Sequence, residues 1–297
     1  MTIEIALAAG NGVGEGPFWD DQEGRLWWVD ITGKAILAWR PGETAPKRWS
    51  MPDFPAAVVL RQSDGALVAL RDGLYRFDPE NGALAVFCRP DADRPDNRSN
   101  EGKCDSRGRF WLGTMQSNLN LDGSARDMTV NSGALYCVHP DGRSTREVDE
   151  VGLSNSLAWS VDGRTLYFGD TLANCIWAFD CDPDAGTLTN RRMFSDASLP
   201  GACDGSAIDS EGCLWNARFG GGCLVRIAPD GRVDRTVALP LTNPTCCCFG
   251  GPDLRTLYIT SARFGLSDQE LADSPNEGAL LALRTDVPGV LCNRFGA

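Results

Sequence analysis

The chain repeats one pattern six times, and this repetition constrains its fold more than any other feature. Most copies contain a tight turn rich in Asp, Ser and Gly, followed by a short apolar or aromatic segment. Apolar segments that alternate with such turns are typical of β-hairpins. The six copies are DDQEGRLWWVD from Asp20, RQSDGALVAL from Arg61, DSRGRFWLGTM from Asp105, SVDGRTLYFGD from Ser160, DSEGCLWNARF from Asp209 and GPDLRTLYITS from Gly251.

The spacing between the copies is typical of propeller blades. They recur roughly every 40 to 55 residues, the spacing of a repeat that forms one four-stranded sheet. Second hairpins lie between them, for example GALYCVHPDGR from Gly133 and GCLVRIAPDGR from Gly222. A β-sandwich of many short strands is the alternative, but it gives no reason for six copies in phase. We therefore predict an all-β fold, a six-bladed β-propeller in which residues 1–297 form a single domain.

Charge and hydropathy narrow the classes of partner. The formal net charge is -12, whereas binding to nucleic acid or anionic membranes depends on clustered Lys and Arg. No apolar run approaches the roughly 18 residues of a membrane span. The chain has no basic residue before Arg25, so the pattern of a secretory signal is absent. We expect a cytoplasmic protein without nucleic-acid or membrane partners.

The twelve cysteines are spread along the chain, and none forms a C-x-x-C pair. This distribution favours free thiols in a reducing compartment over a disulfide framework. The tandem run from Cys246 to Cys248 could supply a soft metal ligand or a nucleophile. We interpret it instead as small apolar side chains buried on a strand, because free cysteine commonly packs in this way.

Residues at the same phase of each repeat should lie at equivalent positions around the propeller axis. In the second and sixth copies, counting back about eight or nine residues from the turn leads near Ala57 and to Cys246. In the other four copies it leads to oxygen-bearing side chains: Glu15, Asn100, Asn155 and Asp204. Each immediately precedes the strand that should be innermost in its blade. We expect these side chains to converge at one mouth of the central channel.

Two carboxylates and two carboxamides form a ligand set that suits a hard divalent cation. The alternative is that these residues are ordinary turn formers, since Asn155 precedes Ser156 and Asp204 precedes Gly205. Four such residues in phase favour a shared site, because burying them in a channel without a cation or hydrogen-bond partners would be unfavourable. The sequence therefore predicts a central metal site.

The single histidine limits the possible chemistry. His139 lies in a turn sequence, VHPDGR, where we expect a surface residue. Without another histidine, Ser-His-Asp and Cys-His mechanisms lack a base, and zinc sites built on two or three histidines are excluded. If the chain is a hydrolase, a metal and carboxylates must carry the reaction.

Five segments together resemble the regucalcin/gluconolactonase family of metal-dependent sugar lactonases, and the resemblance extends nearly end to end. The segments are GEGPFW around Glu15, NRSNEGKCDSRGRFWLGTM from Asn97, LSNSLAWSVDGRTLYFGD from Leu153, DGSAIDSEGCLW from Asp204 and FGGPDLRTLYITSAR from Phe249. The resemblance implies a six-bladed propeller with one metal ion held by Glu15, Asn155 and Asp204.

The resemblance also implies substrate contacts from Arg98 and Asn100. The family pattern reads Arg, any residue, Asn, Asp, but here the fourth position is Glu101. We place Glu101 among the substrate-binding residues too, since its longer side chain could reach a different sugar hydroxyl or support a metal ligand. The segment from Gly113 to Gly133 is expected to form a lid over the site.

The implied activity is metal-dependent hydrolysis of a sugar lactone, an aldono-1,4- or aldono-1,5-lactone, to the aldonic acid, as in bacterial sugar oxidation. This is a carboxylic-ester hydrolase of gluconolactonase, xylonolactonase or arabinolactonase type. We expect Asp204 to act as general base as well as ligand. The cofactor is one divalent ion among Ca²⁺, Mg²⁺, Mn²⁺, Zn²⁺ and Fe²⁺. The partner is a small-molecule lactone, and we expect a monomer because a closed propeller leaves no edge unpaired.

Two other functions remain open on the sequence. One is a non-catalytic, calcium-binding regulatory propeller. The other is a lactonase or esterase for non-sugar substrates, similar to the paraoxonase-like propellers. Those enzymes use histidine near the metal, and the polar pair Arg98 and Asn100 favours a hydroxylated substrate instead.

Overall fold

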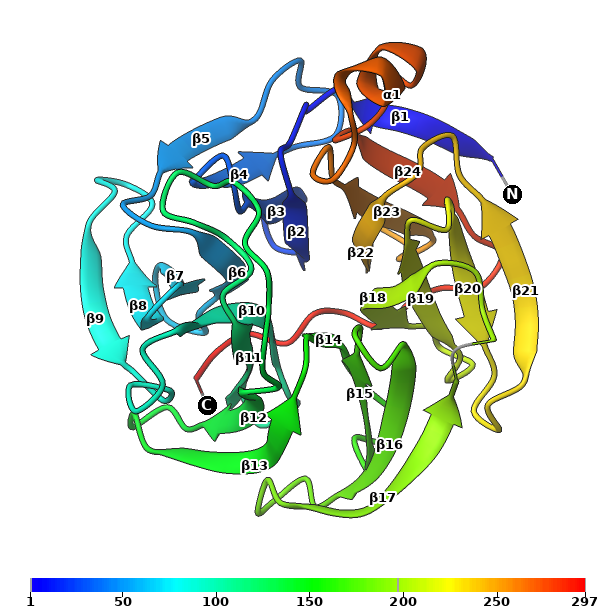
Figure 1. Cartoon of the computed structure of the whole chain (residues 1–297). Helices are drawn as coiled ribbons and strands as arrows, with labels where there is room; N and C mark the ends of the chain where they lie inside the picture. The colour runs from blue at the N-terminus through cyan, green and yellow to red at the C-terminus, as the bar shows by residue number, and fades with distance from the viewer. Residues whose placement is uncertain (1, 197, 297) are drawn as a thin grey trace.

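The computed structural model describes residues 2–196 and 198–296, which form six four-stranded antiparallel sheets around a central channel (Figure 1). This arrangement confirms the predicted all-β, six-bladed propeller. In each sequence repeat, the turn joins the innermost strand of a blade to its neighbour. Gly24, for example, lies between β2 and β3 with a φ of 59°, a left-handed conformation that glycine adopts readily.

The first five blades each consist of four consecutive strands, numbered from the channel outwards. Blade 1 contains β2 (Gly14–Asp20), β3 (Arg25–Asp30), β4 (Ala35–Trp39) and β5 (Lys47–Ser50). Blade 2 contains β6 (Pro55–Leu60), β7 (Ala66–Leu70), β8 (Gly73–Phe77) and β9 (Leu84–Cys88). Blade 3 contains β10 (Asn97–Cys104), β11 (Phe110–Gln116), β12 (Gly133–Val138) and β13 (Ser144–Val151). Blade 4 contains β14 (Ser154–Trp159), β15 (Thr165–Asp170), β16 (Cys175–Cys181) and β17 (Leu188–Ser195). Blade 5 contains β18 (Ala202–Ile208), β19 (Leu214–Phe219), β20 (Cys223–Ile227) and β21 (Val233–Ala238).

The sixth blade is built from both ends of the chain. Its three inner strands are β22 (Pro244–Gly250), β23 (Thr256–Ser261) and β24 (Leu280–Arg284), and its outermost strand is β1 (Ile3–Leu7). This pairing links the two ends of the chain within one sheet and so closes the ring. The connection between β23 and β24 carries the short helix α1 (Asp268–Asp273), which begins with a capping box. No helix within the described ranges is both long and apolar enough to cross a membrane.

In blades 3 and 5, a buried aspartate in the first turn accepts a hydrogen bond from a tryptophan of the same blade. The Asp105 carboxylate accepts hydrogen bonds from Trp111 Nε1 at 2.9 Å and from Arg109 Nε at 2.7 Å. Asp209 repeats the tryptophan contact in blade 5, where it bonds Trp215 Nε1 at 2.9 Å. These aspartates begin the sequence copies DSRGRFW and DSEGCLW, which also contain the two tryptophans. The repeated sequence therefore specifies this hydrogen bond as well as the turn.

The innermost strand of every blade has a register break against its neighbour at the same level. The breaks in blades 1 to 6 fall between Glu15 and Phe18, Pro55 and Ala57, Ser99 and Glu101, Asn155 and Ala158, Cys203 and Ser206, and Pro244 and Cys247. A β-bulge inserts an extra residue and re-aims the side chains beside it. The six breaks therefore form a ring at one end of the channel, and the candidate ligands lie within it.

The C-terminal segment, residues 286–296, passes across the opposite end of the channel (Figure 1). Its backbone hydrogen-bonds to blade 5 through Val290 N and Ile208 O at 3.1 Å. It reaches blade 2 through Phe295 N and Leu60 O at 2.9 Å, and blade 3 through Gly296 N and Gly108 O at 2.9 Å. The segment thus ties blades on opposite sides of the ring.

The buried ion pair between Asp105 and Arg109 gives a test of the packing within blade 3. Both side chains are only 5% exposed. Asp105→Ala should lower the free energy of unfolding by about 3 to 5 kcal/mol, because it leaves a buried guanidinium without its counter-charge. The measurement is urea unfolding followed by tryptophan fluorescence.

A matched control is available at the surface. Asp141 pairs with Arg143 at the same 2.7 Å distance, but the side chains are 55% and 73% exposed. Asp141→Ala should change the free energy of unfolding by no more than about 1 kcal/mol. Equal effects of the two substitutions would contradict the structural role of the Asp105 carboxylate.

Candidate active site

Cavities lie at both ends of the channel, and only one is lined by acidic side chains. The far cavity lies beside the C-terminal segment, and its walls include Phe18, Leu157 and Phe249, with no Asp or Glu among the described lining residues. The entrance cavity lies at the level of the register breaks. It is lined by Val13, Glu15, Ile31, Arg98, Asn100, Asn118, Leu119, Leu153, Asn155, Thr171, Asp204, Phe219, Thr245 and Phe264.

The four side chains in phase along the sequence all line the entrance cavity. Glu15 comes from β2, Asn100 from β10, Asn155 from β14 and Asp204 from β18. Glu15, Asn155 and Asp204 are 8%, 5% and 7% exposed, so they are buried yet reach the cavity. Four different blades thus contribute oxygen-bearing groups to one place.

Hydrogen bonds orient the two amides. Asn155 Nδ2 donates to Thr171 Oγ1 at 2.8 Å, and this hydroxyl donates to the Cys203 carbonyl at 2.7 Å. Asn100 Nδ2 donates to the Ser154 carbonyl at 2.8 Å and to Asn155 Oδ1 at 3.3 Å. With its nitrogen held by Thr171, Asn155 retains its amide oxygen as the atom that can act as a ligand.

The acidic pair Glu15 and Asp204 is held in an unfavourable electrostatic environment. Burial, together with the neighbouring Glu101 carboxyl, raises the pKa of Glu15 to about 8. Burial raises the pKa of Asp204 well above its usual range, and the Glu15 and Glu101 charges add to the effect. Desolvated like charges disfavour ionisation. A cation between the carboxyls would reverse that balance.

The donor set fits a hard divalent cation. Carboxylate and amide oxygens from Glu15, Asp204 and Asn155 converge, and they are ligands typical of Ca²⁺, Mg²⁺ and Mn²⁺. Across residues 2–196 and 198–296, no three His, Cys, Asp or Glu side chains are grouped so that they could hold a metal ion. A cation at this site therefore needs the Asn155 amide oxygen as well as the carboxyls.

Arg98 forms the cationic wall of the entrance cavity. Its Nε and Nη2 donate to Asn118 Oδ1 at 3.0 and 2.9 Å, and its Nη1 donates to the Ser99 carbonyl at 2.8 Å. Burial lowers the pKa of Arg98 to about 10, and the Glu15 carboxylate opposes this shift. The guanidinium still carries its charge at neutral pH and is fixed in orientation.

The expected lid is the connection between β11 and β12, and two of its residues, Asn118 and Leu119, line the cavity. In Figure 1 it extends across the ring toward the first blade. Lys34 Nζ donates to the Leu121 carbonyl at 3.1 Å at that end. The connection therefore bridges two blades above the site.

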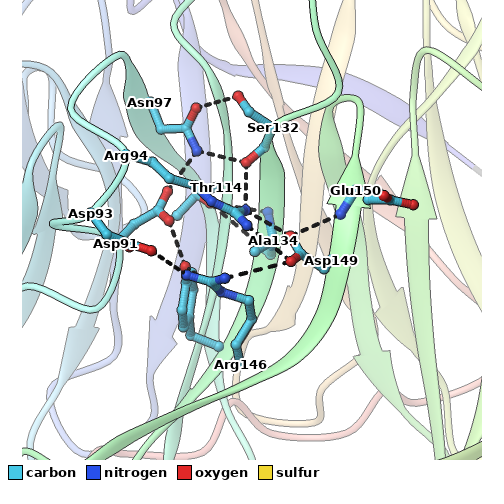
Figure 2. Close-up of polar contacts among 11 residues, drawn as sticks. Asp91, Asp93, Arg94, Asn97, Thr114, Ser132, Ala134, Arg146, Asp149 and Glu150 are labelled. Atoms are coloured by element: carbon cyan, nitrogen blue, oxygen red, sulfur yellow. Dashed lines mark hydrogen bonds and ion pairs between the residues drawn. The ribbon is translucent and has the colours of Figure 1, made fainter.

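The other end of this connection is anchored beside the start of β10 (Figure 2). The Ser132 carbonyl accepts from Asn97 Nδ2 and Arg94 Nη1, both at 2.8 Å. Arg94 also pairs with Asp149 at 2.7 Å. Because Asn97 immediately precedes Arg98, this network fixes the lid and the cationic wall together.

Three residues singled out in the sequence lie outside the entrance cavity. Glu101 is 3% exposed and is not among the lining residues, so its expected contact with a substrate gains no support from this geometry. His139 lies in the turn between β12 and β13, where its backbone N bonds the Arg143 carbonyl. Cys247 is buried and packs with apolar neighbours, as expected for a small apolar side chain.

Sequence reasoning missed three residues of the site. Thr171 and Asn118 act by orienting other side chains, and this role has no recognisable motif in the sequence. The register places Thr245, rather than Cys246, at the position of Asp204. Pro244 and Cys247 flank the register break in blade 6, just as Cys203 and Ser206 flank the break in blade 5. Thr245 lines the cavity.

The fold and the cavity define a six-bladed propeller with a polar, acidic site at one mouth of its channel. Residues 13–263 match the family described as the SMP-30/Gluconolactonase/LRE-like region, and the chain belongs to this family.

Individual relatives match over nearly their full length. Regucalcin of Xenopus laevis is 36% identical, over 94% of this chain and 93% of the relative. The 6-deoxy-6-sulfogluconolactonase of Pseudomonas putida is also 36% identical, over 97% and 96%. The crystal structure of a calcium-binding protein, regucalcin, from Agrobacterium tumefaciens superimposes with a TM-score of 0.91 at 30% identity, covering 99% of this chain and 97% of that chain.

The raised pKa of Glu15 predicts that the stability of the cation-free protein, measured in the presence of a chelator, depends on pH. Between its ordinary value of 4.5 and about 8, the folded state binds more protons at this group than the unfolded state does. Stability should therefore fall as pH rises from about 5 to 8. Thermal unfolding in EDTA across this range is the measurement, and Glu15→Gln should flatten the decline. An unchanged or rising Tm for the unsubstituted protein would contradict the assigned environment.

Proposed function

We propose that this protein hydrolyses a sugar lactone to the aldonic acid with the help of one divalent cation held by Glu15, Asn155 and Asp204. The observation that carries the proposal is the convergence of these three side chains, with Arg98 and Asn100, in one cavity. Membership of the family and the gluconolactonase relative support the reaction class. Ca²⁺, Mg²⁺ and Mn²⁺ suit the oxygen ligands best, and Zn²⁺ or Fe²⁺ also accept them.

Different residues bind the lactone and transfer the proton. Arg98 and Asn100 hold oxygens of the lactone and fix the position of its carbonyl. The Asp204 carboxylate accepts a proton from the attacking water as the water oxygen bonds to the carbonyl carbon. When bound, the cation supplies Lewis-acid polarisation of that carbonyl. The ring C–O bond then breaks, and Asp204 returns the proton to the ring oxygen, which becomes a hydroxyl of the aldonic acid.

The substrate class follows from the lining of the cavity. The guanidinium of Arg98 and the amide of Asn100 favour a hydroxylated ligand, while Leu119, Leu153 and Phe264 add apolar lining. The single histidine, His139, lies in the turn between β12 and β13, so we assign the proton-transfer role to the Asp204 carboxylate. Both aldono-1,4- and aldono-1,5-lactones carry the required carbonyl and hydroxyl groups.

Asp204→Asn tests the catalytic role. At saturating divalent cation, it should lower kcat for aldonolactone hydrolysis at least about 100-fold, because general acid–base catalysis contributes at least this much. Asp230→Asn, in an exposed turn, is the control and should keep the normal rate. Chelator should abolish activity of the unsubstituted protein, and added cation should restore it.

Acid release from a panel of hexono- and pentonolactones, corrected for spontaneous opening, is the readout. Full activity after removal of divalent cations would contradict the proposal, as would a normal rate for Asp204→Asn. Cation binding without hydrolysis of any lactone would favour a non-catalytic calcium-binding propeller.

Asn118→Ala tests the positioning of Arg98. Without its acceptor, the guanidinium loses two hydrogen bonds to Asn118 Oδ1. The KM for lactone should rise about 10-fold, consistent with the loss of a hydrogen bond to a charged group, while cation affinity stays unchanged. Asn120→Ala is the matched control, because Asn120 is exposed on the same connection and bonds Ser124. Equal KM values for the two variants would contradict the role of Asn118.

A further inference from the structure

We propose that Glu101 acts on the cation rather than on the sugar: its carboxyl lies deeper in the channel than the ligands and supplies a third negative charge to the cation site. This inference rests on the cation site of the proposed function. It does not depend on which lactone is hydrolysed, or on hydrolysis at all.

The position of Glu101 along β10 separates it from the substrate side. The preceding residue, Asn100, lines the entrance cavity, and the following residues, Gly102 and Lys103, line the far cavity. Glu101 is absent from the lining of both and is 3% exposed. Its side chain is therefore buried at the level between the two cavities, below the ring of ligands.

The two carboxylate oxygens of Glu101 have unequal environments. Oε1 accepts a hydrogen bond from Gly102 N at 2.9 Å. Oε2 is buried and has no hydrogen-bond partner among the described residues. A buried carboxylate oxygen without a partner is unfavourable in a protein interior. This orphaned oxygen indicates an interaction that the described residues do not supply.

Glu15, in blade 1, has the same kind of backbone hydrogen bond. Its Oε2 accepts from the following glycine, Gly16 N, at 2.8 Å. Both glutamates lie at register breaks of innermost strands, in blades 1 and 3. Each is held by one oxygen to the backbone of the next residue, which leaves the other oxygen free of that contact.

The charge of Glu101 acts on both acidic ligands. It is one of the neighbours that raise the pKa of Glu15 and of Asp204, so the three carboxyls lie within range of one another. Their mutual repulsion is relieved by a divalent cation, and the attraction to that cation grows with each negative charge in a medium of low dielectric constant. Among the described residues, no three acidic side chains are grouped as ligands. Glu101 therefore strengthens cation binding without being one of the three ligands.

A cation of the protein itself, Lys103, lies close enough for its charge to interact with the Glu101 carboxyl. Lys103, two residues further along β10, donates from Nζ to the Ser206 carbonyl. Its charge keeps the buried carboxyl compatible with the folded chain before the divalent ion binds. The order along the channel is thus ligands, Glu101, then Lys103.

The test measures cation affinity in the absence of sugar. Isothermal titration of the purified full chain with Mn²⁺ and with Ca²⁺ should give a Kd about 10- to 100-fold weaker for Glu101→Gln, the range seen when groups behind metal ligands are removed. Glu101→Asp, which keeps the charge, should stay closer to the unsubstituted Kd than Glu101→Gln does.

The outcomes separate this inference from the proposed function. Unchanged cation affinity for Glu101→Gln, with a raised KM for lactone, would overturn it and restore the substrate contact suggested by the sequence pattern. Equal weakening by Glu101→Asp and Glu101→Gln would also overturn it, because charge would then not be the cause. Weaker cation binding by Glu101→Gln alone would support it even if no lactone were hydrolysed.

Discussion

Six sheets packed around one axis leave a channel along which their innermost strands lie. Each innermost strand reaches it with a register break at the same level. The breaks bring side chains from separate blades to one mouth of the channel, far apart in sequence but at one place in space. The site depends on closure of the ring, which β1 and β24 complete with the pairs Ile3 to Leu283 and Ile5 to Leu281.

Within that ring, the dominant effect is the burial of the carboxyls away from water, and their mutual repulsion adds to it. Glu15 and Asp204 are desolvated together, with Glu101 below them, and the surrounding hydrogen bonds do not neutralise them. In the function that we propose, a divalent cation makes this arrangement favourable. The acids that raise each other's pKa values would then be its ligands, and Asp204 would exchange a proton with the substrate.

The periodicity of the turns was enough to predict the blades and the four phased residues of the entrance cavity, because each repeat carries its turn and strand locally. Thr245 was missed because the residue count between turn and innermost strand varies, so Cys246 was reached instead. Closure by residues 3–7 and the path of residues 286–296 depend on long-range pairing, for which a single sequence offers no local pattern. Thr171 and Asn118 orient Asn155 and Arg98 through side-chain geometry, which only the folded chain reveals.

The most direct measurement of the central claim is the anomalous scattering of Mn²⁺ in crystals of the full chain. The account predicts one strong peak at the channel mouth, within about 2.0 to 2.6 Å of oxygens from Glu15, Asn155 and Asp204, the range for hard divalent cations. It predicts that the Glu101 carboxyl lies farther from the ion than that range, deeper in the channel. A peak held by other residues, or no peak in crystals grown with excess Mn²⁺, would contradict the account.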